Sequence, residues 1–401
     1  MRPAVRDEPR PHTRGAPRRA HPRSAGPADG GAVALRAQTQ SARDPFVLLK
    51  PLAALAAAVA LIALVVLALG ASPVRVFAAL WEGAFGNWFA LTDTLTKSTP
   101  LVFTGLAIAV AFSASLWNIG ADGQLIIGAL AAGAVGPMLG GWPRPLGIAT
   151  VLVSGAIGGA LWGGVCGWLR ARRATSEVIS TIMLNFVAMQ LLSWAVHGPL
   201  MEPPGAYPKS VAIARAARMY MFDPPSRLNP AMLLALGLAL GCHFFLFRST
   251  AGFELRALGR NRRAATFFAI PADAVAIWAM ALSGALAGLG GAVQVSAITH
   301  RLYEKMSPGW GYEAIAVALV ARLNPPWIVA SAIFFGALDS GSQAMQRAEG
   351  ISPVLVQVIQ GLVILILLAL DTPAFSRLRE SFGRFAQSEG YEQSLTEGSD
   401  A

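Results

Sequence analysis

Polar residues that interrupt apolar stretches mark the positions of this sequence where chemistry is expected. The segment from Asn118 to Gln124 separates two hydrophobic stretches and carries a carboxylate, Asp122, between Gly120 and Gly123. A carboxylate between membrane helices is costly and therefore faces a cavity or a partner, while the glycines allow a helix break whose free backbone groups could bind a polar solute. We predict that Asn118, Asp122 and Gln124 line a solute pathway; the alternative is a short loop with an exposed Asp122.

A second polar pair, Glu177 and Asn185, lies in a later apolar stretch. The two residues are eight positions apart, so both side chains point to the same face of a helix, close to Ser180 and Thr181. Two interpretations are open from the residues alone. Either the pair lines the same solute pathway, or Asn185 hydrogen-bonds to a neighbouring helix.

A third segment, from Gly252 to Thr266, is short, basic and amphipathic, and Gly259 interrupts it. Such a helix beside a membrane suits docking onto a soluble partner. The residues by themselves favour a different role, a basic anchor that binds the headgroups of anionic membrane lipid.

Motifs of catalysis and metal binding are absent from the sequence. The four lysines follow no glycine-rich loop, which excludes a Walker-type nucleotide site. No HExxH, GxSxG or paired-histidine metal spacing occurs, and His197, His243 and His300 are scattered at helix ends. Cys166 and Cys242 both lie in apolar stretches, which indicates buried thiols rather than a disulfide. We therefore expect no catalytic residue, no metal and no cofactor.

The composition predicts a membrane protein. Of the 401 residues, 54% are hydrophobic and only 13% are charged, compared with about 25% charged in an ordinary soluble domain. Residues 51–370 hold only 31 of the 54 charged side chains, too few for a water-soluble surface around 320 residues. The mean hydropathy of +0.52 agrees with this interpretation. The expected fold class is an all-α polytopic integral membrane protein.

Apolar stretches long enough to span a bilayer, about 20 residues each, divide the chain into three parts. We expect a disordered basic cytoplasmic tail at 1–45, a transmembrane domain at 46–370 and a cytoplasmic C-terminal tail at 371–401. With the N-terminus inside, and counting only those tail residues that lie within about 15–20 residues of a helix, 15 Arg and Lys residues fall on the cytoplasmic side and 10 on the outer side. The prediction is about ten transmembrane segments, at 51–70, 99–117, 119–139, 146–169, 177–197, 229–247, 272–298, 311–319, 327–345 and 351–370.

The segments between and outside the predicted spans allow three further predictions. The proline pair Pro325-Pro326 ends a helix, so residues 311–322 form either a span or a re-entrant half-helix. The outer loops at 71–98 and 199–228 are expected to contain short surface helices. The N-terminal tail holds ten Arg and Lys against four acidic residues without aromatic interleaving, which favours retention in the cytoplasm over nucleic-acid binding.

Glycines at four-residue spacing predict close helix contacts. Small residues on one ridge let two backbones approach in lipid, where the hydrophobic effect does not drive association. One ridge of four glycines and two shorter repeats have this spacing: Gly155, Gly159, Gly163 and Gly167, then Gly237 and Gly241, and Gly284 and Gly288.

Five stretches taken together resemble the permease subunits of ATP-binding-cassette importers, most of all the nucleoside and simple-sugar branch related to ribose and branched-chain amino-acid permeases. The resemblance covers about residues 50–370 and is carried by NIGADGQ, SEVISTIMLN, ELRALGRNRRAA, SGALAGLGGAVQV and GYEAIAVALVARLNP.

The resemblance implies that the chain is one half of a channel in the bacterial inner membrane that imports a small polar solute. It implies three kinds of partner: cytoplasmic ATPase subunits that hydrolyse ATP, an extracytoplasmic substrate-binding protein, and a second, non-identical permease. It also implies that the basic segment meets the ATPase. The residues that match the family's coupling segment are Arg256, Gly259, Asn261, Ala264 and Ala265.

Three positions depart from the family pattern. The family usually has Glu where this chain has Asp122, commonly has Gly near Ala321, and often has Gly at the position of Pro326.

A second function class stays open, an ion-coupled secondary transporter. It would use membrane-embedded acidic residues as a relay, and the candidates are Asp122, Glu177, Glu313 and Asp339.

Overall fold

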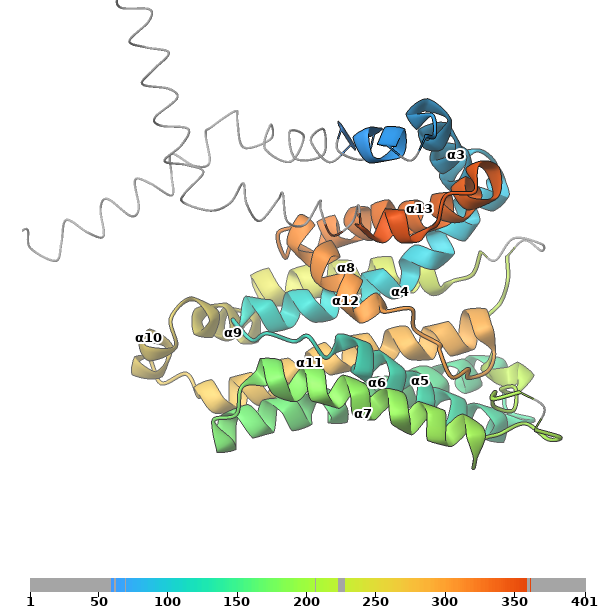
Figure 1. Cartoon of the computed structure of the whole chain (residues 1–401). Helices are drawn as coiled ribbons and strands as arrows, with labels where there is room; N and C mark the ends of the chain where they lie inside the picture. Colours follow the sequence, from blue (N-terminus) through green and yellow to red (C-terminus); the bar gives the residue numbers. More distant parts are fainter. Residues whose placement is uncertain are drawn as a thin grey trace, which may run out of the picture. The chain divides into compact units, whose positions relative to one another are not determined.

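The computed structural model describes residues 59–60, 63–68, 70–205, 207–222, 228–358 and 361. These residues belong to one compact unit, which begins at Ala54 (Figure 1). The expected tails at 1–45 and 371–401 lie outside the described residues, as do most of the first and last predicted spans.

The described part of the chain is almost entirely helical. In chain order its elements are α3 (Pro73–Phe85), α4 (Trp88–Ser113), α5 (Ala121–Val135), the 3-10 helix η2 (Gly136–Leu139), α6 (Arg144–Arg173), α7 (Glu177–His197), the 3-10 helix η3 (Arg215–Ala217), α8 (Ala231–Arg248), α9 (Thr250–Arg260), α10 (Arg262–Phe267), α11 (Ala272–Val293), the π-helix η4 (Gln294–Thr299), α12 (Trp310–Val320) and α13 (Pro325–Glu349).

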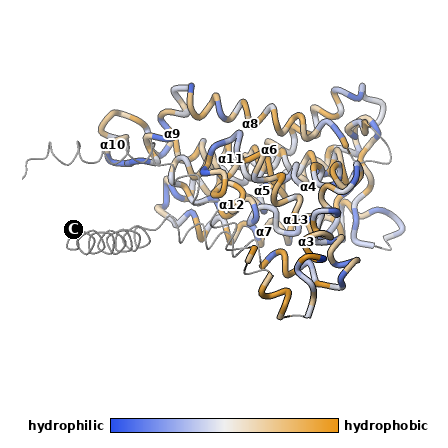
Figure 2. The backbone as a smooth tube through the Cα atoms, turned by 90° about the horizontal axis from the view of Figure 1, so that it is seen from above, coloured by the Kyte–Doolittle hydropathy of each residue, from blue (hydrophilic) through white to orange (hydrophobic). Residues whose placement is uncertain are grey.

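Six helical stretches in this part of the chain are long and apolar enough to cross a membrane, and Figure 2 shows hydrophobic residues along much of the tube. They confirm the predicted spans between residues 99 and 298. The predicted span at 327–345 lies in α13, which carries more polar residues and is not among the six. The spans are Trp88–Ser113, Ala121–Leu139, Arg144–Arg173, Glu177–His197, Ala231–Arg248 and Ala272–Thr299.

The helix α4 begins eleven residues before the predicted start of its span, at Trp88 instead of residue 99. Asn87 caps it, because its side-chain oxygen accepts a hydrogen bond from the Ala90 amide at 2.8 Å. Hydroxyl groups in the first turns bond to carbonyls of the same helix, as Ser98 does to Thr94 at 2.7 Å. The outer loop expected at 71–98 therefore ends before Trp88, because hydroxyl groups of this polar stretch bond to carbonyls within α4. The short helix expected in the same segment is present as α3.

The other outer segment, 199–228, was expected to contain a surface helix as well. Among its described residues only the short turn η3, from Arg215 to Ala217, is helical. The surface helix expected in this segment is therefore reduced to a single 3-10 turn.

The glycine ridge of α6 packs against α11, as its spacing predicted. A Cβ atom added to Gly159 would overlap the carbonyl oxygen of Gly284, and one added to Gly288 would overlap that of Gly155. Gly163 and Gly167 face α11 in the same way. The four-residue spacing on both helices therefore marks a true backbone-to-backbone seam.

The same spacing in α8 does not mark a contact. Within the part of the chain that the structure describes, no atom lies within 4 Å of a Cβ added to Gly237 or Gly241. The predicted close helix contact at Gly237 and Gly241 is therefore wrong within this subunit. These glycines provide a matched control for the seam.

The short helix α12 has 11 residues, about 16 Å at 1.5 Å per residue, which is half of a bilayer core of about 30 Å. Arg322 and Leu323 have left-handed backbones, with φ of 50° and 57°, and α13 then starts at Pro325. The predicted break is confirmed, and the length of α12 favours a half-helix over a full span.

Candidate functional site

Four of the five predicted pathway residues meet where α5 begins. Asn118 donates to Oε1 of Gln124 at 2.9 Å and to the hydroxyl of Ser283 on α11 at 2.8 Å, and Nε2 of Gln124 donates back to Asn118 at 3.0 Å. Ser283 in turn donates to the carbonyl of Ala107 on α4 at 2.6 Å. Asn118 and Gln124 are fully buried, so their amides join α4, α5 and α11.

Asn185 of α7 satisfies the backbone at the same break. Its Oδ1 accepts from the Gly123 amide at 2.8 Å, and its Nδ2 donates to the Ile119 carbonyl at 2.9 Å and to the Tyr312 hydroxyl at 3.0 Å. Irregular backbone at membrane depth is tolerated only where protein satisfies its polar groups. The cross-helix role is therefore the one that the contacts of Asn185 support.

Asp122 caps the half-helix α12 from the side of α5. Its Oδ1 accepts from the Ser307 hydroxyl at 2.6 Å and from the Gly311 amide, in the first turn of α12, at 3.0 Å. The negative charge also complements the positive end of the helix dipole. Asp122 is buried, so the alternative of an exposed loop carboxylate is wrong, and its place is that of a partner to α12.

Glu177 lies apart from these residues. It shares the buried face of α7 with Asn185 as predicted, but its carboxylate forms an ion pair with Arg170 near the end of α6. The pair joins the two helices at the corner where α6 turns into α7. Glu177 and Asn185 thus lie on one face but have separate partners.

We expect Asn185→Leu to destabilise the folded protein clearly. The substitution leaves the Gly123 amide and the Ile119 carbonyl buried without a partner, and each such group costs about 1–3 kcal/mol. Thermal unfolding in detergent should show a lower midpoint by several degrees. Gln190→Leu, on the exposed face of the same helix, is the control and should unfold like the parent; an equal loss in both variants would contradict the capping role.

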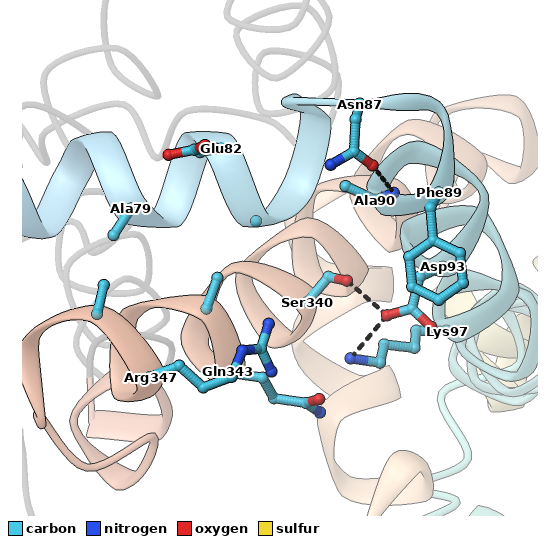
Figure 3. A pocket seen from close by; sticks show the side chains of 13 residues that line it. Ala79, Glu82, Asn87, Phe89, Ala90, Asp93, Lys97, Ser340, Gln343 and Arg347 are labelled. Carbon is cyan, nitrogen blue, oxygen red and sulfur yellow. Dashed lines mark hydrogen bonds and ion pairs between the residues drawn. The ribbon is translucent and has the colours of Figure 1, made fainter.

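A polar groove of 650 Å³ lies between α3, α4 and the second half of α13 (Figure 3). It combines acidic, basic and amide side chains with one aromatic ring, a mixture that suits a polar solute. The polar and aromatic residues that line it are Glu82, Asn87, Phe89, Asp93, Lys97, Ser340, Gln343 and Arg347.

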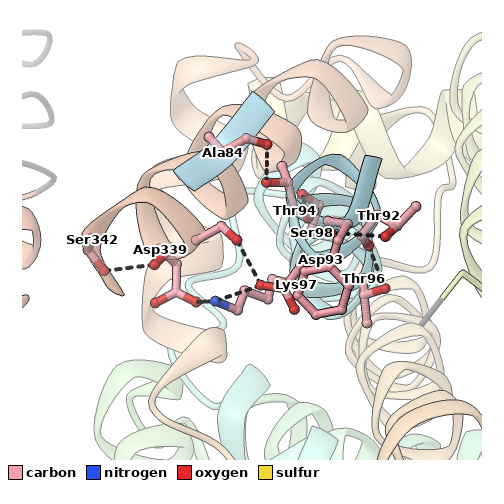
Figure 4. A network of polar contacts seen from close by, with 11 residues as sticks. Ala84, Thr92, Asp93, Thr94, Thr96, Lys97, Ser98, Asp339 and Ser342 are labelled. Carbon is pink, nitrogen blue, oxygen red and sulfur yellow. Dashed lines mark hydrogen bonds and ion pairs between the residues drawn. The ribbon is translucent and has the colours of Figure 1, made fainter. Parts of the chain in front are cut away.

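A charged cluster includes two residues that line this groove, Asp93 and Lys97, and links them to Asp339 (Figure 4). Lys97 of α4 lies 3.1 Å from Oδ2 of Asp93 and 3.3 Å from Oδ2 of Asp339 on α13, and Ser340 donates to Asp93 at 2.8 Å. The side chain of Asp339 is 52% exposed. Ionisable side chains in membrane helices face a water-filled cavity or a protein partner rather than lipid.

The sequence interpretation missed most of this cluster. It named Asp339 only as a candidate of the ion-coupled alternative and did not single out Asp93 or Lys97, because residues 71–98 were expected to form an outer loop with a short surface helix. The available signal was the Asp-to-Lys spacing of four residues, which brings the two charges together on a helix.

The basic segment forms the helices α9 and α10, and α9 meets the end of α4. A Cβ added to Gly259 would overlap the carbonyl oxygen of Ser113, and the Ser115 hydroxyl donates to the Gly259 carbonyl at 2.6 Å. The expected interruption at Gly259 is wrong: α9 continues to Arg260. The break falls at Asn261, whose side chain caps α10 through the amides of Arg263 and Ala264.

The five predicted coupling residues differ in exposure. Asn261 and Ala264 are exposed, Arg256 and Gly259 are half-buried, and Ala265 is buried. Two residues that the sequence interpretation did not name, Phe267 and Phe268 just beyond them, are 86% and 75% exposed. Adjacent exposed aromatic side chains of this kind are typical of protein contact sites.

Metal ligation has no support in the described part of the chain, where no group of three or more His, Cys, Asp and Glu side chains could hold an ion. Cys166 and Cys242 are both free thiols, the first buried and the second half-buried.

Sequence comparison places these features in context. Residues 90–368 match the family described as branched-chain amino acid transport system / permease component. The chain is 33% identical to the guanosine ABC transporter permease protein NupP of Bacillus subtilis over 79% of this chain and 92% of that protein. It is 32% identical to the nucleoside ABC transporter permease protein NupB of Lactococcus lactis (79% and 89%) and 30% identical to the glucose ABC transporter permease protein TsgB13 of Haloferax volcanii (76% and 83%).

Proposed function

The chain belongs to the permease-component family of branched-chain amino acid transport systems, and from this premise we propose that it forms half of an import channel for a nucleoside or a simple sugar. It is a multi-pass inner-membrane permease subunit of an ABC importer. It is not itself catalytic, because ATP hydrolysis belongs to separate ATPase subunits. The family also implies a substrate-binding protein as a partner.

The proposed solute class is supported by the names of the relatives and by the groove. Relatives at 30–33% identity are named for guanosine, nucleosides and glucose. All of these solutes carry hydroxyl groups, which the carboxylates and amide of the groove can bind. The exposed ring of Phe89 at the rim of the groove offers the apolar surface that such a site also needs.

We propose that the solute contacts the groove around Asp93, Lys97 and Asp339, while Asn118, Asp122, Gln124 and Asn185 hold the helix break. The buried amides and Asp122 already have protein partners at 2.6–3.1 Å. The groove, in contrast, opens to the surface, and Lys97 in its lining pairs with Asp339, whose side chain is half-exposed. In a membrane such a face needs a protein cover, which supports a second, non-identical permease opposite it.

We further propose that α9 and α10 transmit the movement of the ATPase. Gly259 and Ala265 seat the two helices on the membrane domain, and Asn261 fixes the angle between them. Arg256, whose guanidinium lies 5.1 Å from the centre of the Phe247 ring, ties α9 to α8. Ala264, Phe267 and Phe268 then remain on the surface to contact the ATPase.

The double substitution Phe267→Ser and Phe268→Ser should uncouple the transporter. An exposed aromatic residue that inserts into a partner's pocket often contributes about 2 kcal/mol or more. Loss of one such contribution weakens ATPase binding by about thirtyfold, and the double variant should weaken it by at least that factor. Solute uptake and solute-stimulated ATP hydrolysis should fall together while membrane insertion is unchanged. Tyr207→Ser, also exposed but in the segment between α7 and α8, is the control; full coupling in the double variant would reject these residues as the contact.

Reconstitution tests the function as a whole. Proteoliposomes that contain the chain, a second permease, the ATPase subunits and the binding protein should accumulate labelled guanosine or glucose only when ATP is present. Accumulation driven by the membrane potential without ATPase subunits would instead favour the ion-coupled transporter.

A further inference from the structure

A second groove, of 540 Å³, lies at the start of α6. Its six lining residues include three arginines, Arg144, Arg215 and Arg218, and no acidic residue. Gly155 of α6 lies against Ala292 of α11, while Gly167 lies against Ile277, so α6 and α11 run antiparallel. The groove is therefore at the end of these helices away from α10, which immediately precedes α11.

The structure holds two of these guanidinium groups in fixed positions. Arg144 donates to the carbonyls of Arg218 and Met219 at 2.9 and 3.1 Å, and its guanidinium lies 3.5 Å from the centre of the Tyr220 ring. Arg218 donates through two nitrogens to the Ile213 carbonyl at 3.1 and 3.0 Å. Each guanidinium has five N–H donors, so these contacts leave donors free for a ligand.

Three permanent positive charges around one groove repel each other unless an anion joins them. The excess of Arg and Lys in membrane proteins normally lies on the cytoplasmic side. This groove lies on the other side if α9 and α10 are cytoplasmic, so its sidedness rests on the proposed function. A local anionic ligand explains why arginines gather there, and planar guanidinium groups match the geometry of phosphate oxygens.

The surroundings of the groove point to a lipid phosphate. Trp142, one of the lining residues, is 49% exposed, as expected of an aromatic ring at the level of lipid headgroups. Further along α6 from Trp142, the exposed side chains of Leu146, Val153 and Ile157 form an apolar stripe. Acyl chains can lie on this stripe. A protein partner would instead need a broad patch of about 800 Å², whereas this site is a small concave one.

We propose that this groove binds the headgroup phosphate of an anionic phospholipid in the outer leaflet, with its acyl chains along the exposed face of α6. Arg144 and Arg218 form the fixed part of the site, and the exposed Arg215 provides its third positive charge. The site is separate from the solute groove between α3, α4 and α13.

The full-length chain in nanodiscs provides the test, with phosphatidylcholine alone or mixed with phosphatidylglycerol. Native mass spectrometry should detect retained phosphatidylglycerol on the parent protein. Arg215→Gln should lower that retention by about fivefold, as expected for one basic contact at a membrane surface, and Arg144→Gln should lower it at least as much. Arg173→Gln, an exposed arginine at the opposite end of the same helix, is the control and should retain the lipid.

Several outcomes would overturn the proposal. These are an equal loss of lipid in Arg173→Gln, no preference for phosphatidylglycerol in the parent, or displacement of the lipid by inorganic phosphate alone, which would assign the groove to a soluble anion. Weaker capture of the binding protein by Arg215→Gln with unchanged lipid retention would also overturn it. Because lipid retention is measured without transport, a failed uptake assay and a failed lipid assay are distinguishable.

Discussion

Lys97→Met will abolish most solute uptake without removing the protein from the membrane. The substitution leaves Asp93 and Asp339 without the ammonium group that lies 3.1 and 3.3 Å from them. The two carboxylates then repel each other without a compensating positive charge, which alters the solute groove. We expect uptake to fall by at least about tenfold, since Lys97 and Asp93 are mostly buried and loss of one member of a buried charge pair has effects of this size or larger.

The control for this experiment is Lys209→Met. Lys209 also pairs with a carboxylate, that of Glu202 at 3.0 Å, but in the segment between α7 and α8, where its hydrogen bond holds the pKa of Glu202 below the usual value. Glu202 also pairs with Arg301 at 2.7 Å and the three side chains are only partly buried, so loss of Lys209 changes little and uptake should stay near that of the parent. Lys97→Arg should restore part of the uptake, because it keeps the charge. Normal uptake by Lys97→Met would exclude the cluster from the pathway.

Gly159→Leu will prevent the folding of the membrane domain. A side chain at this position meets the backbone of α11 at Gly284 and Gly288, and a backbone cannot move aside as a side chain can. Overpacking a core commonly costs about 1–3 kcal/mol, and separation of two whole helices costs more. We expect almost no monodisperse protein after detergent extraction, measured by fluorescence-detected size-exclusion chromatography.

Gly237→Leu is the matched control, since it makes the same substitution in another apolar helix at the same glycine spacing. No described atom lies near a Cβ at this position, so the variant should elute like the parent. Similar losses in the two variants would mean that the effect comes from the leucine itself and not from the seam between α6 and α11.

Several features could be predicted from the sequence because they depend on local patterns. Hydropathy located the helices between residues 99 and 298, glycine spacing located the α6 ridge, and the proline pair located the start of α13. Five quoted stretches were enough to identify the family, which the match over residues 90–368 confirms. The coupling residues and the carried solute remain predictions.

Other features depended on partners that are distant in the sequence. Asn185 meets Gly123 across 62 positions, and Asp122 meets Gly311 across 189, so local spacing could not decide whether these side chains face solute or protein. The pairing of Lys97 with Asp339 was missed for the same reason, because one residue lies on α4 and the other on α13.

The sequence by itself determined that this protein is an assembly of apolar helices, where its glycine ridge lies, and to which family it belongs. Only the tertiary structure decided that Gly159 contacts another helix within the subunit while Gly237 does not. It likewise decided that Asn185 and Asp122 bind the backbone at the helix break, and that Lys97 joins the carboxylates of Asp93 and Asp339. The physical reason is that helix formation and membrane partition depend on neighbouring residues, whereas the satisfaction of a buried polar group depends on which helices pack around it.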